Sequence, residues 1–275
     1  MKATLEDFKN EAWGVHPIQF DTVADLYDFY VNVDLDIDFF VREARQIGGK
    51  ALELTSGTGR VSIPLLQAGV ELTCLDYSGE MLAKLREKLQ SNRLHCTVLE
   101  QNMTELTLAH RFDLIFIPFH SFQEIVDRSK HQQTLQRILA HLNPGGCFIC
   151  TLQNPSVRLQ SIDGTLRLLG RFPTGSDGSL EVKSILTYDA AERLVTGLQL
   201  YERFDLNGIL LEKRQLEISF CLFSRNEFEL LVRSAGFTVD DLFGDYACSP
   251  FDEETSPFMI WRLSKPRIDL SRPSA

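Results

Sequence analysis

A glycine-containing loop at residues 53–60 (ELTSGTGR) stands between a short apolar run and a segment with helical spacing. Gly57 and Gly59 would let the backbone approach a ligand closely and present N–H groups at the start of a helix. A dinucleotide-binding fingerprint would place its third glycine at position 62, where this chain has Ser62. Glu53 would repel a pyrophosphate but suit a cation. The loop therefore indicates a ligand site, and its acid favours a cationic ligand.

Polar side chains also follow three later apolar runs. Asp76 ends the run 71–76, where a carboxylate can accept hydrogen bonds from both hydroxyls of a ribose or cap the next helix. An amide in residues 100–103 (EQNM) suits the edge of an adenine, and residues 118–124 (PFHSFQE) follow the longest apolar run. In an open α/β sheet, ligands bind outside the carboxyl ends of the strands. The four segments are therefore expected to form one site.

Apolar patterning predicts the elements that must position these segments. After two helices within residues 23–47, strands and helices alternate, which indicates βαβ units around a parallel sheet. The predicted strands are 50–55, 71–76, 94–102, 112–119 and 147–153, and the predicted helices between them are 61–69, 78–90 and 131–142. Residues 143–146 (NPGG) predict a turn before the last of these strands.

The pattern changes in the second half of the chain. Three runs joined by short turns within residues 179–222 predict an antiparallel meander. Residues 223–237 predict a helix in which Ser224 is the N-cap and Glu227 completes a capping box. Two late strands follow, and the last residues of the chain are expected to be frayed.

Taken together, these segments resemble the ordered motifs of class I S-adenosylmethionine-dependent methyltransferases that act on small molecules. The resemblance covers about residues 25–153 and rests on ALELTSGTGRVSIPLLQAG, LTCLDYSGEML, LEQNMTEL, FDLIFIPFHSF and LNPGGCFICTL. It implies an α/β fold with a doubly wound, mostly parallel seven-stranded sheet of the Rossmann-like type, here with an inserted antiparallel meander. The expected division is an N-terminal helical cap (1–40), a cofactor-binding core (41–155 and 223–266) and a cover on the substrate side (156–222).

The resemblance also assigns residues to the cofactor, S-adenosylmethionine. The glycine loop would surround the methionine part of the cofactor, and the acid after the second strand would bind its ribose. The segments that come later in the chain would contact its adenine. A YDxxY-like pair of tyrosines would close the pocket from above, and the segment after the longest run would line the methyl-transfer site. The implied cofactor-binding residues are Tyr27, Tyr30, Glu53, Gly57, Thr58, Gly59, Asp76, Tyr77, Met81, Asn102, Met103, Pro118 and Phe119.

Two positions depart from the family pattern. Thr55 replaces the first motif glycine, and its Cβ would crowd the loop. Asn102 replaces the usual aspartate of the third motif, although the carbonyl oxygen of an amide can still pair with an adenine amine.

His120 and Glu124 are the candidate catalytic residues. If a helix begins at this segment, their i, i+4 spacing places both side chains on one face. Either would serve as a general base for an amine or hydroxyl acceptor. We expect His120 to matter more because it directly follows the buried strand and should point towards the transferred methyl. Relatives often carry a histidine at the position of Glu124, so that role is not copied from them.

These features predict a methyltransferase acting on a nitrogen of a small metabolite, in preference to oxygen or carbon. The alternative is a regulatory or scaffold protein that binds the cofactor but has weak catalysis, which Thr55 and the missing histidine support. A nicotinamide oxidoreductase is disfavoured by Ser62.

The composition of the chain limits the classes of molecule that it is expected to bind. The 28 basic and 38 acidic residues give a formal net charge of −10, which disfavours nucleic acid as a partner because phosphates are neutralised by Lys and Arg. No apolar run approaches the roughly 20 residues needed to span a bilayer. Acids near the start, where a signal peptide is apolar, favour a cytoplasmic location.

Cys147 and Cys150 lack a second cysteine pair, so no metal site is expected. The sequence leaves open whether the protein forms a homodimer. The acidic run 34–38 is expected to be a solvated helix face or to favour a cationic substrate.

Overall fold

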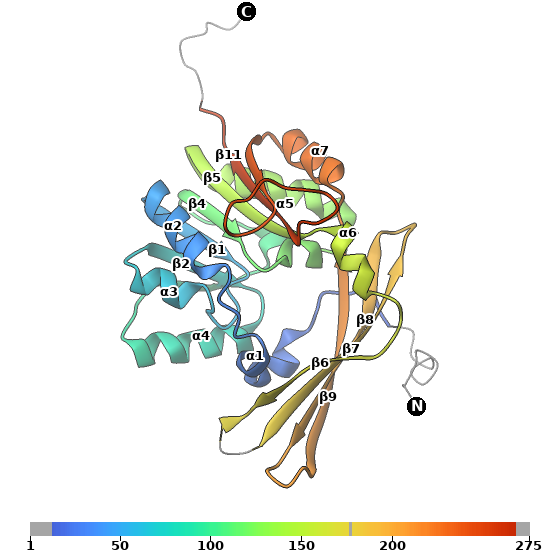
Figure 1. Ribbon diagram of the computed structural model, residues 1–275. Coiled ribbons are helices and arrows are strands. Elements are labelled where there is room, and N and C mark those ends of the chain that lie inside the picture. Colours follow the sequence, from blue (N-terminus) through green and yellow to red (C-terminus); the bar gives the residue numbers. More distant parts are fainter. Residues whose placement is uncertain (1–12, 176–177, 268–275) are drawn as a thin grey trace, which may run out of the picture.

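The computed structural model describes residues 13–175 and 178–267. The expectations for residues 1–12 and for the tail from residue 268 lie outside this part of the chain. Figure 1 shows a layered α/β core and, below it, a second sheet that extends away from the core. A short N-terminal helix lies between the two.

The core of the described chain is a seven-stranded sheet with strand order β10-β11-β5-β4-β1-β2-β3. Neighbours among β1 to β5 pair in parallel, and β11 pairs antiparallel with both β5 and β10. The strands are β1 (Lys50–Leu54), β2 (Glu71–Asp76), β3 (Thr97–Glu100), β4 (Phe112–Ile117), β5 (Leu142–Gln153), β10 (Thr238–Phe243) and β11 (Phe258–Ser264). This topology confirms the predicted doubly wound sheet, whose order reverses between β1 and β4.

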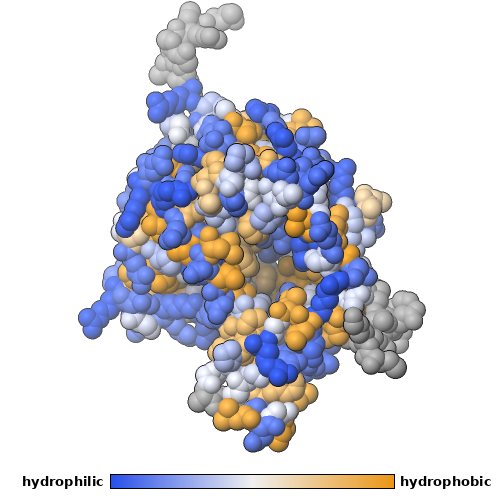
Figure 2. All heavy atoms as spheres, in the orientation of Figure 1, coloured by the Kyte–Doolittle hydropathy of each residue, from blue (hydrophilic) through white to orange (hydrophobic). Residues whose placement is uncertain are grey.

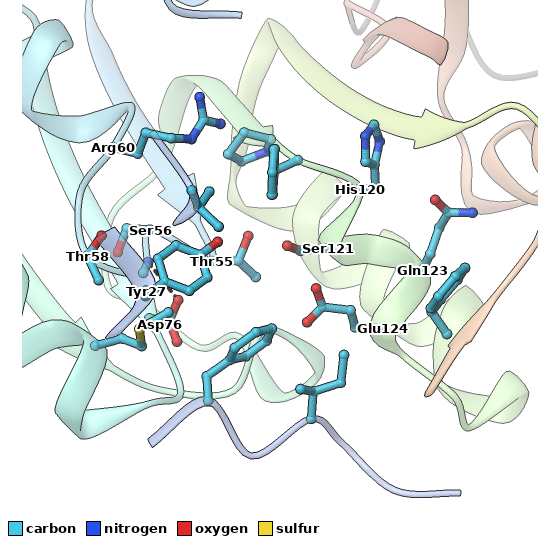
Figure 3. Close-up of a pocket in the computed structure, with 18 of the residues that line it drawn as sticks. Tyr27, Thr55, Ser56, Thr58, Arg60, Asp76, His120, Ser121, Gln123 and Glu124 are labelled. Atoms are coloured by element: carbon cyan, nitrogen blue, oxygen red, sulfur yellow. Dashed lines mark hydrogen bonds between the residues drawn. The ribbon is translucent and has the colours of Figure 1, made fainter. Parts of the chain in front are cut away.

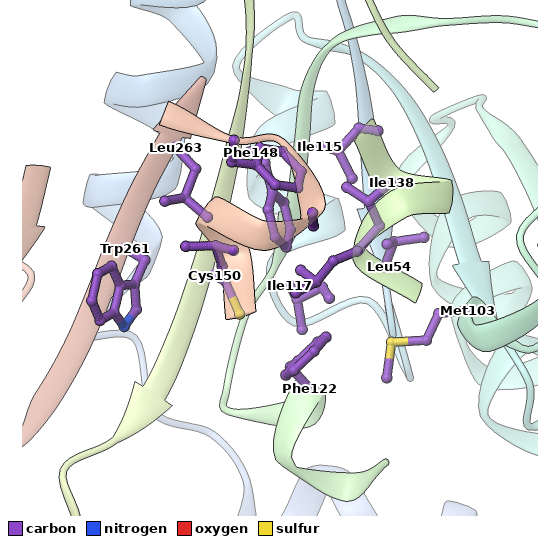
Figure 4. Packing of buried hydrophobic residues seen from close by; sticks show 14 of the residues in the cluster. Leu54, Met103, Ile115, Ile117, Phe122, Ile138, Phe148, Cys150, Trp261 and Leu263 are labelled. Carbon is purple, nitrogen blue, oxygen red and sulfur yellow. The ribbon is translucent and has the colours of Figure 1, made fainter. Parts of the chain in front are cut away.

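Helices cover both faces of this sheet. One face packs against α2 (Ile37–Ile47), α3 (Ser62–Gln67) and α4 (Gly79–Asn92), and the other packs against α5 (Arg128–His141) and α7 (Arg225–Ala235). Figure 4 shows the cluster on the side of α5 and α7, to which Trp261, Phe148 and Ile138 belong. Among the described residues, no helix is long and apolar enough to cross a membrane.

The predicted element boundaries differ from the structure in a few places. The predicted turn at residues 143–146 lies inside β5, where the register to β4 shifts between Phe112 and Leu114. Cys147 and Cys150 on β5 pack in different clusters, on opposite faces of the sheet. The predicted capping box of α7 is present.

The second sheet of the described chain has the order β6-β7-β8-β9, and all of its pairs are antiparallel. Its strands are β6 (Arg167–Pro173), β7 (Ser179–Asp189), β8 (Leu194–Phe204) and β9 (Leu210–Cys221). The meander confirms the prediction for residues 179–222, but the sequence did not predict the edge strand β6. Most of its side chains are exposed, so it lacks the alternating apolar pattern of its neighbours. The short helix α6 (Pro155–Arg158) connects β5 to this sheet.

The N-terminal segment joins the two sheets. The 3₁₀ helix η2 (Phe20–Val23) and the helix α1 (Ala24–Tyr30) share an apolar cluster with the meander. The expected cap boundary at residue 40 falls inside α2, because Phe39 and Phe40 are buried in the core cluster that α2 shares with α3 and α4. Only the segment before α2 therefore lies over the meander.

We expect a fragment ending near residue 155 to lack a cooperative thermal transition. Strand β11 pairs with β5 along seven residues, and Phe228 and Trp261 are fully buried against the first sheet. The truncation would expose this apolar surface. Its burial in the whole chain contributes roughly 25 cal/mol per Å² to the free energy of unfolding. Differential scanning calorimetry of the purified fragment and the whole chain provides the comparison. A sharp transition of the fragment would show that the core does not need its C-terminal strands.

Candidate active site

A cavity of about 320 Å³ opens at the carboxyl ends of β1, β2 and β4, under α1 and beside the meander. Figure 2 shows apolar atoms lining a hollow between the core and the meander. The structure brings most of the predicted site residues to its wall: Tyr27, Tyr30, Glu53, Gly57, Thr58, Asp76, Tyr77, Met81, Pro118, Phe119, His120 and Glu124. Gly59, Asn102 and Met103 are placed behind the wall, each for a local reason given below.

Gly57 forms a cradle that a side chain would fill. Its φ is +53°, and a Cβ built there would meet only the Met81 methyl, at 3.8 Å. Because both residues line the cavity, that Cβ would occupy space available to a ligand. Gly59 has a different reason to be glycine: at φ +87°, a Cβ would lie 2.4 Å from Leu85 Cδ1 on α4. Gly59 therefore allows the loop to pack against a helix.

Thr55 adopts the backbone conformation of the glycine it replaces. Its φ is +62°, which is unusual and strained for a β-branched residue. The Thr55 hydroxyl donates to the Leu54 carbonyl at 2.5 Å, and Thr55 lines the cavity. The expected crowding is thus taken up as a strained but glycine-like turn.

Asp76 organises the loop as well as facing the cavity. Its Oδ2 accepts the Gly57 N–H at 2.8 Å, and its Oδ1 accepts the Ser78 N–H at 2.9 Å. Burial raises the pKa of Asp76. A carboxylate has about four acceptor positions, so each oxygen keeps capacity for a ligand hydroxyl. The α4 cap itself is Ser78, which leaves Asp76 able to serve a ribose.

Glu53 is almost completely buried, with 1% of its surface exposed. The Ser62 hydroxyl donates to Glu53 Oε2 at 2.5 Å, so the serine that replaces a fingerprint glycine orients this acid. Burial raises the pKa of Glu53 to about 8. A bound cation would favour the ionised form of Glu53, because its positive charge replaces the stabilisation that the carboxylate loses when burial removes water. Together with Gly57 and Asp76, Glu53 fits the cationic methionine part of S-adenosylmethionine.

We expect Glu53→Gln to stabilise the ligand-free protein at pH 8 and to weaken S-adenosylmethionine binding. The folded pKa of Glu53 lies above its ordinary value of 4.5, so the wild-type protein loses stability as pH rises from about 4.5 to 8. Glutamine keeps an acceptor for Ser62 but does not ionise. Thermal denaturation of both proteins at pH 5 and pH 8 checks this: the advantage of the variant should grow with pH. A difference that is the same at both pH values would contradict the assignment.

The N-terminal segment is fastened over the cavity at several points. Thr58 donates to Asp28 Oδ1 at 2.7 Å, and the Tyr77 hydroxyl donates to the Ile18 carbonyl. On the meander side, the hydroxyl groups of Tyr30 and Tyr201 are 2.9 Å apart. These contacts place α1 between the glycine loop and the meander.

Asn102 and Met103 lie behind the cavity wall. The Asn102 Oδ1 accepts the Thr104 N–H at 2.9 Å and caps the 3₁₀ helix η3 (Met103–Glu105). Met103 is 7% exposed and packs in the core cluster, as Figure 4 shows. In this arrangement neither side chain contacts the cavity, so their expected contact with an adenine edge stays a prediction that needs a different local conformation.

The expectation that His120 and Glu124 share a helical face is wrong. Phe119 and His120 have φ of +55° and +70°, and the 3₁₀ helix η4 (Ser121–Glu124) begins only after them. The His120 ring stacks on Phe119 and Phe258 at centroid distances of 5.9 and 5.2 Å. Figure 3 shows Glu124 turned towards Thr55 and Tyr27, while His120 points the other way.

Electrostatics also separates these two side chains. Burial and then the charges of Arg158 and Arg60 lower the pKa of His120 to about 3. Burial and then the nearby Asp76 raise the pKa of Glu124 to about 8. A general base is most effective when its pKa lies near the working pH. Of the two side chains, Glu124 therefore has the pKa closer to the neutral range.

Sequence reasoning assigned no role to several polar residues of the cavity wall. Arg60 binds Asp36 through both carboxylate oxygens, with Nη2 to Oδ2 at 2.7 Å, and its Cζ lies 4.8 Å from the Phe119 ring centroid. Asp36 is 1% exposed, so this acid is not part of a solvated face. Gln123, Gln153, Gln199 and Arg158 are further examples. Arg60 and Asp36 are 24 residues apart in the sequence, and no short motif indicates such a pair.

A comparison of the chain with protein families decides the class of domain. A family described as Methyltransferase domain matches residues 51–146, the part that carries β1 to β4, the glycine loop and Asp76. This segment is a methyltransferase domain.

The methyltransferase domain has named relatives and a solved structural neighbour. Glycine/sarcosine N-methyltransferase of Halorhodospira halochloris is 29% identical over 137 residues, which are 49% of this chain and 51% of the relative. The chain thus spans about half the length of that relative. Cypemycin N-terminal methyltransferase of Streptomyces sp is 25% identical over 80% of this chain and 86% of its own.

The structural neighbour is an S-adenosylmethionine-dependent methyltransferase from Clostridium acetobutylicum ATCC 824. It has a TM-score of 0.75 and 18% identity, and the match covers 90% of this chain and 99% of the neighbour. This likeness shows that the chain has the fold of that methyltransferase.

Proposed function

We propose that this protein transfers a methyl group from S-adenosylmethionine to a nitrogen atom of a small metabolite. The observation that carries the proposal is the position of Glu124, a carboxyl group that faces the same cavity as the glycine loop and Asp76. The name of one relative, glycine/sarcosine N-methyltransferase, supports nitrogen as the acceptor atom.

The residues divide the work by their chemistry. Asp76 would hold the ribose of the cofactor, and Gly57 with Glu53 would hold its methionine part. When bound, S-adenosylmethionine supplies an activated methyl group on a sulfonium. Glu124 would hold the amine and accept its proton, because its carboxylate is available as pH approaches 8. The buried aromatic wall, which includes Tyr27 and Phe119, would exclude water and align the reacting atoms.

The structure weakens the argument for a catalytically weak scaffold protein. That argument rested on Thr55 and on the absence of a histidine at position 124. Thr55 keeps the left-handed turn of the loop, and Glu124 supplies a carboxyl group with a pKa near the neutral range. Both features are compatible with turnover.

Release of S-adenosylhomocysteine tests this proposal. The purified protein is incubated with S-adenosylmethionine and with matched pairs of primary amines and alcohols of the same carbon skeleton. Product formation with amines only is the expected result. Equal turnover of the alcohols would contradict nitrogen as the acceptor, and tight cofactor binding without turnover of any acceptor would favour a binding protein.

A further inference from the structure

Two arginines line the cavity, and they differ in their partners. Arg60 is neutralised by the buried Asp36, which it binds through two nitrogen atoms. Arg158 donates from Nε to Gln153 Oε1 at 3.2 Å and from Nη1 to Ser161 Oγ at 2.8 Å, and both of these acceptors are neutral. Within residues 13–175 and 178–267, no carboxylate lies within 4.0 Å of Arg158.

Arg158 lies at a partly buried position, where a missing acidic partner leaves its charge uncompensated. It is the last residue of α6, where the chain passes from the end of β5 to the meander, and its Cζ lies 5.7 Å from the Phe220 ring centroid. The side chain is partly buried, and burial lowers its pKa. An arginine stays charged in proteins, so a partly buried guanidinium without an acid has lost solvation that no protein charge offsets.

The lining of the cavity combines apolar side chains with the amides of Gln123, Gln153 and Gln199. Ile218 and Phe220 of β9 and Leu186 of β7 line it together with Arg158. Glu124 stands on the strand end of the core, whereas Arg158 stands at the junction with the meander. The wall therefore presents an acid for an amine, an apolar surface and a separate cation.

We propose that Arg158 binds an oxyanion of the acceptor substrate, so that the protein methylates an amine whose own skeleton carries a carboxylate or a phosphate. The planar fork of a guanidinium binds both groups through two parallel hydrogen bonds. Arg158 acts here as a specificity-determining residue, and Glu124 receives the amine at the other end. This inference rests on the proposed function, because it assumes an amine acceptor.

The test uses matched acceptors with and without the oxyanion. Phenylalanine is compared with phenethylamine for the carboxylate, and phosphoethanolamine with ethanolamine for the phosphate. Arg158→Gln retains a polar side chain without charge, and Arg158→Lys retains the charge without the fork. Arg45, which donates to the Ala68 carbonyl on the surface, gives the matched control Arg45→Gln. The rate of S-adenosylhomocysteine release gives kcat and KM, and calorimetry gives the affinity for S-adenosylmethionine.

The wild-type protein is expected to prefer the oxyanion-bearing member of one pair. Arg158→Gln should lower kcat/KM for that member by about ten- to a hundredfold, mainly through KM, because a charge-assisted hydrogen bond is lost. The rate with the member that lacks the oxyanion, the cofactor affinity and the activity of Arg45→Gln should change by less than about twofold. Arg158→Lys should restore part of the preference.

Three outcomes would overturn the inference. An equal loss on both members of a pair means that Arg158 is structural. A similar loss of S-adenosylmethionine affinity means that Arg158 holds the carboxylate of the cofactor. A wild-type preference for the member without the oxyanion means that the acceptor carries no oxyanion. In each of these cases the proposed amine methylation stands. If neither member of any pair is methylated, the proposed function fails and this inference fails with it.

Discussion

Replacing Asp76 by alanine is expected to weaken S-adenosylmethionine binding by about ten- to a hundredfold. The ribose would lose its hydrogen bonds to the carboxylate of Asp76, and a hydrogen bond to a charged group contributes roughly 1.5–3 kcal/mol to binding. The same change removes the acceptor of the Gly57 N–H, so the loop that cradles the methionine part loses its anchor. Isothermal titration calorimetry of the folded variant measures the affinity directly.

Asp113 provides a matched control for this change. It lies at the start of β4, where it accepts hydrogen bonds from the Lys50 N–H at 2.9 Å and from Asn143 Nδ2 at 2.8 Å. Asp113→Ala therefore removes two comparable hydrogen bonds at the opposite end of the strands. It should lower the melting temperature without changing cofactor affinity. If Asp76→Ala binds the cofactor as tightly as this control, Asp76 has no role in the ribose site.

Glu124→Gln is expected to lower turnover by about 10²–10⁴-fold while leaving S-adenosylmethionine affinity nearly intact. Glutamine keeps the shape and a hydrogen-bonding group but cannot take a proton. Because burial raises the pKa of Glu124 to about 8, the basic form increases with pH up to that value. The kcat/KM of the wild-type protein should therefore rise with pH and level off near 8, and the variant should lose this rise.

His120→Asn is the comparison for that experiment. With a pKa of about 3 and a ring stacked between Phe119 and Phe258, His120 is neutral across the working range and contributes to packing. Its replacement should change turnover much less than that of Glu124, and the rise of the profile near pH 8 should persist. A large loss in His120→Asn together with a wild-type profile in Glu124→Gln would reverse the assignment.

Local patterns in the sequence were sufficient to predict the main elements of the fold. The strand at 71–76 and the capping box of Ser224 and Glu227 have the predicted bounds and contacts, because both depend on residues close together in the chain. Strand β6 was missed for the opposite reason: its exposed residues acquire their partner only when β7 lies beside them.

The candidate site divides in the same way. Gly57 and Asp76 follow strands whose order the pattern reveals, so their common position at the strand ends could be predicted. The orientation of His120 could not, because it depends on two consecutive left-handed residues and on Phe258, far away in the chain. The surroundings of Arg158 could not be predicted either, because the lack of an acidic partner among the described residues becomes visible only in the folded chain.

The position of a labelled methyl group tests the central claim most directly. The purified protein is incubated with a small-metabolite extract and S-adenosylmethionine that carries a deuterated methyl group, and the products are fragmented in a mass spectrometer. The account predicts a labelled methyl on the nitrogen of an amine, with about ten- to a hundredfold less labelled product from the Asp76→Ala protein at a subsaturating cofactor concentration. A label found on oxygen or carbon, or no labelled product from the wild-type protein, would contradict it.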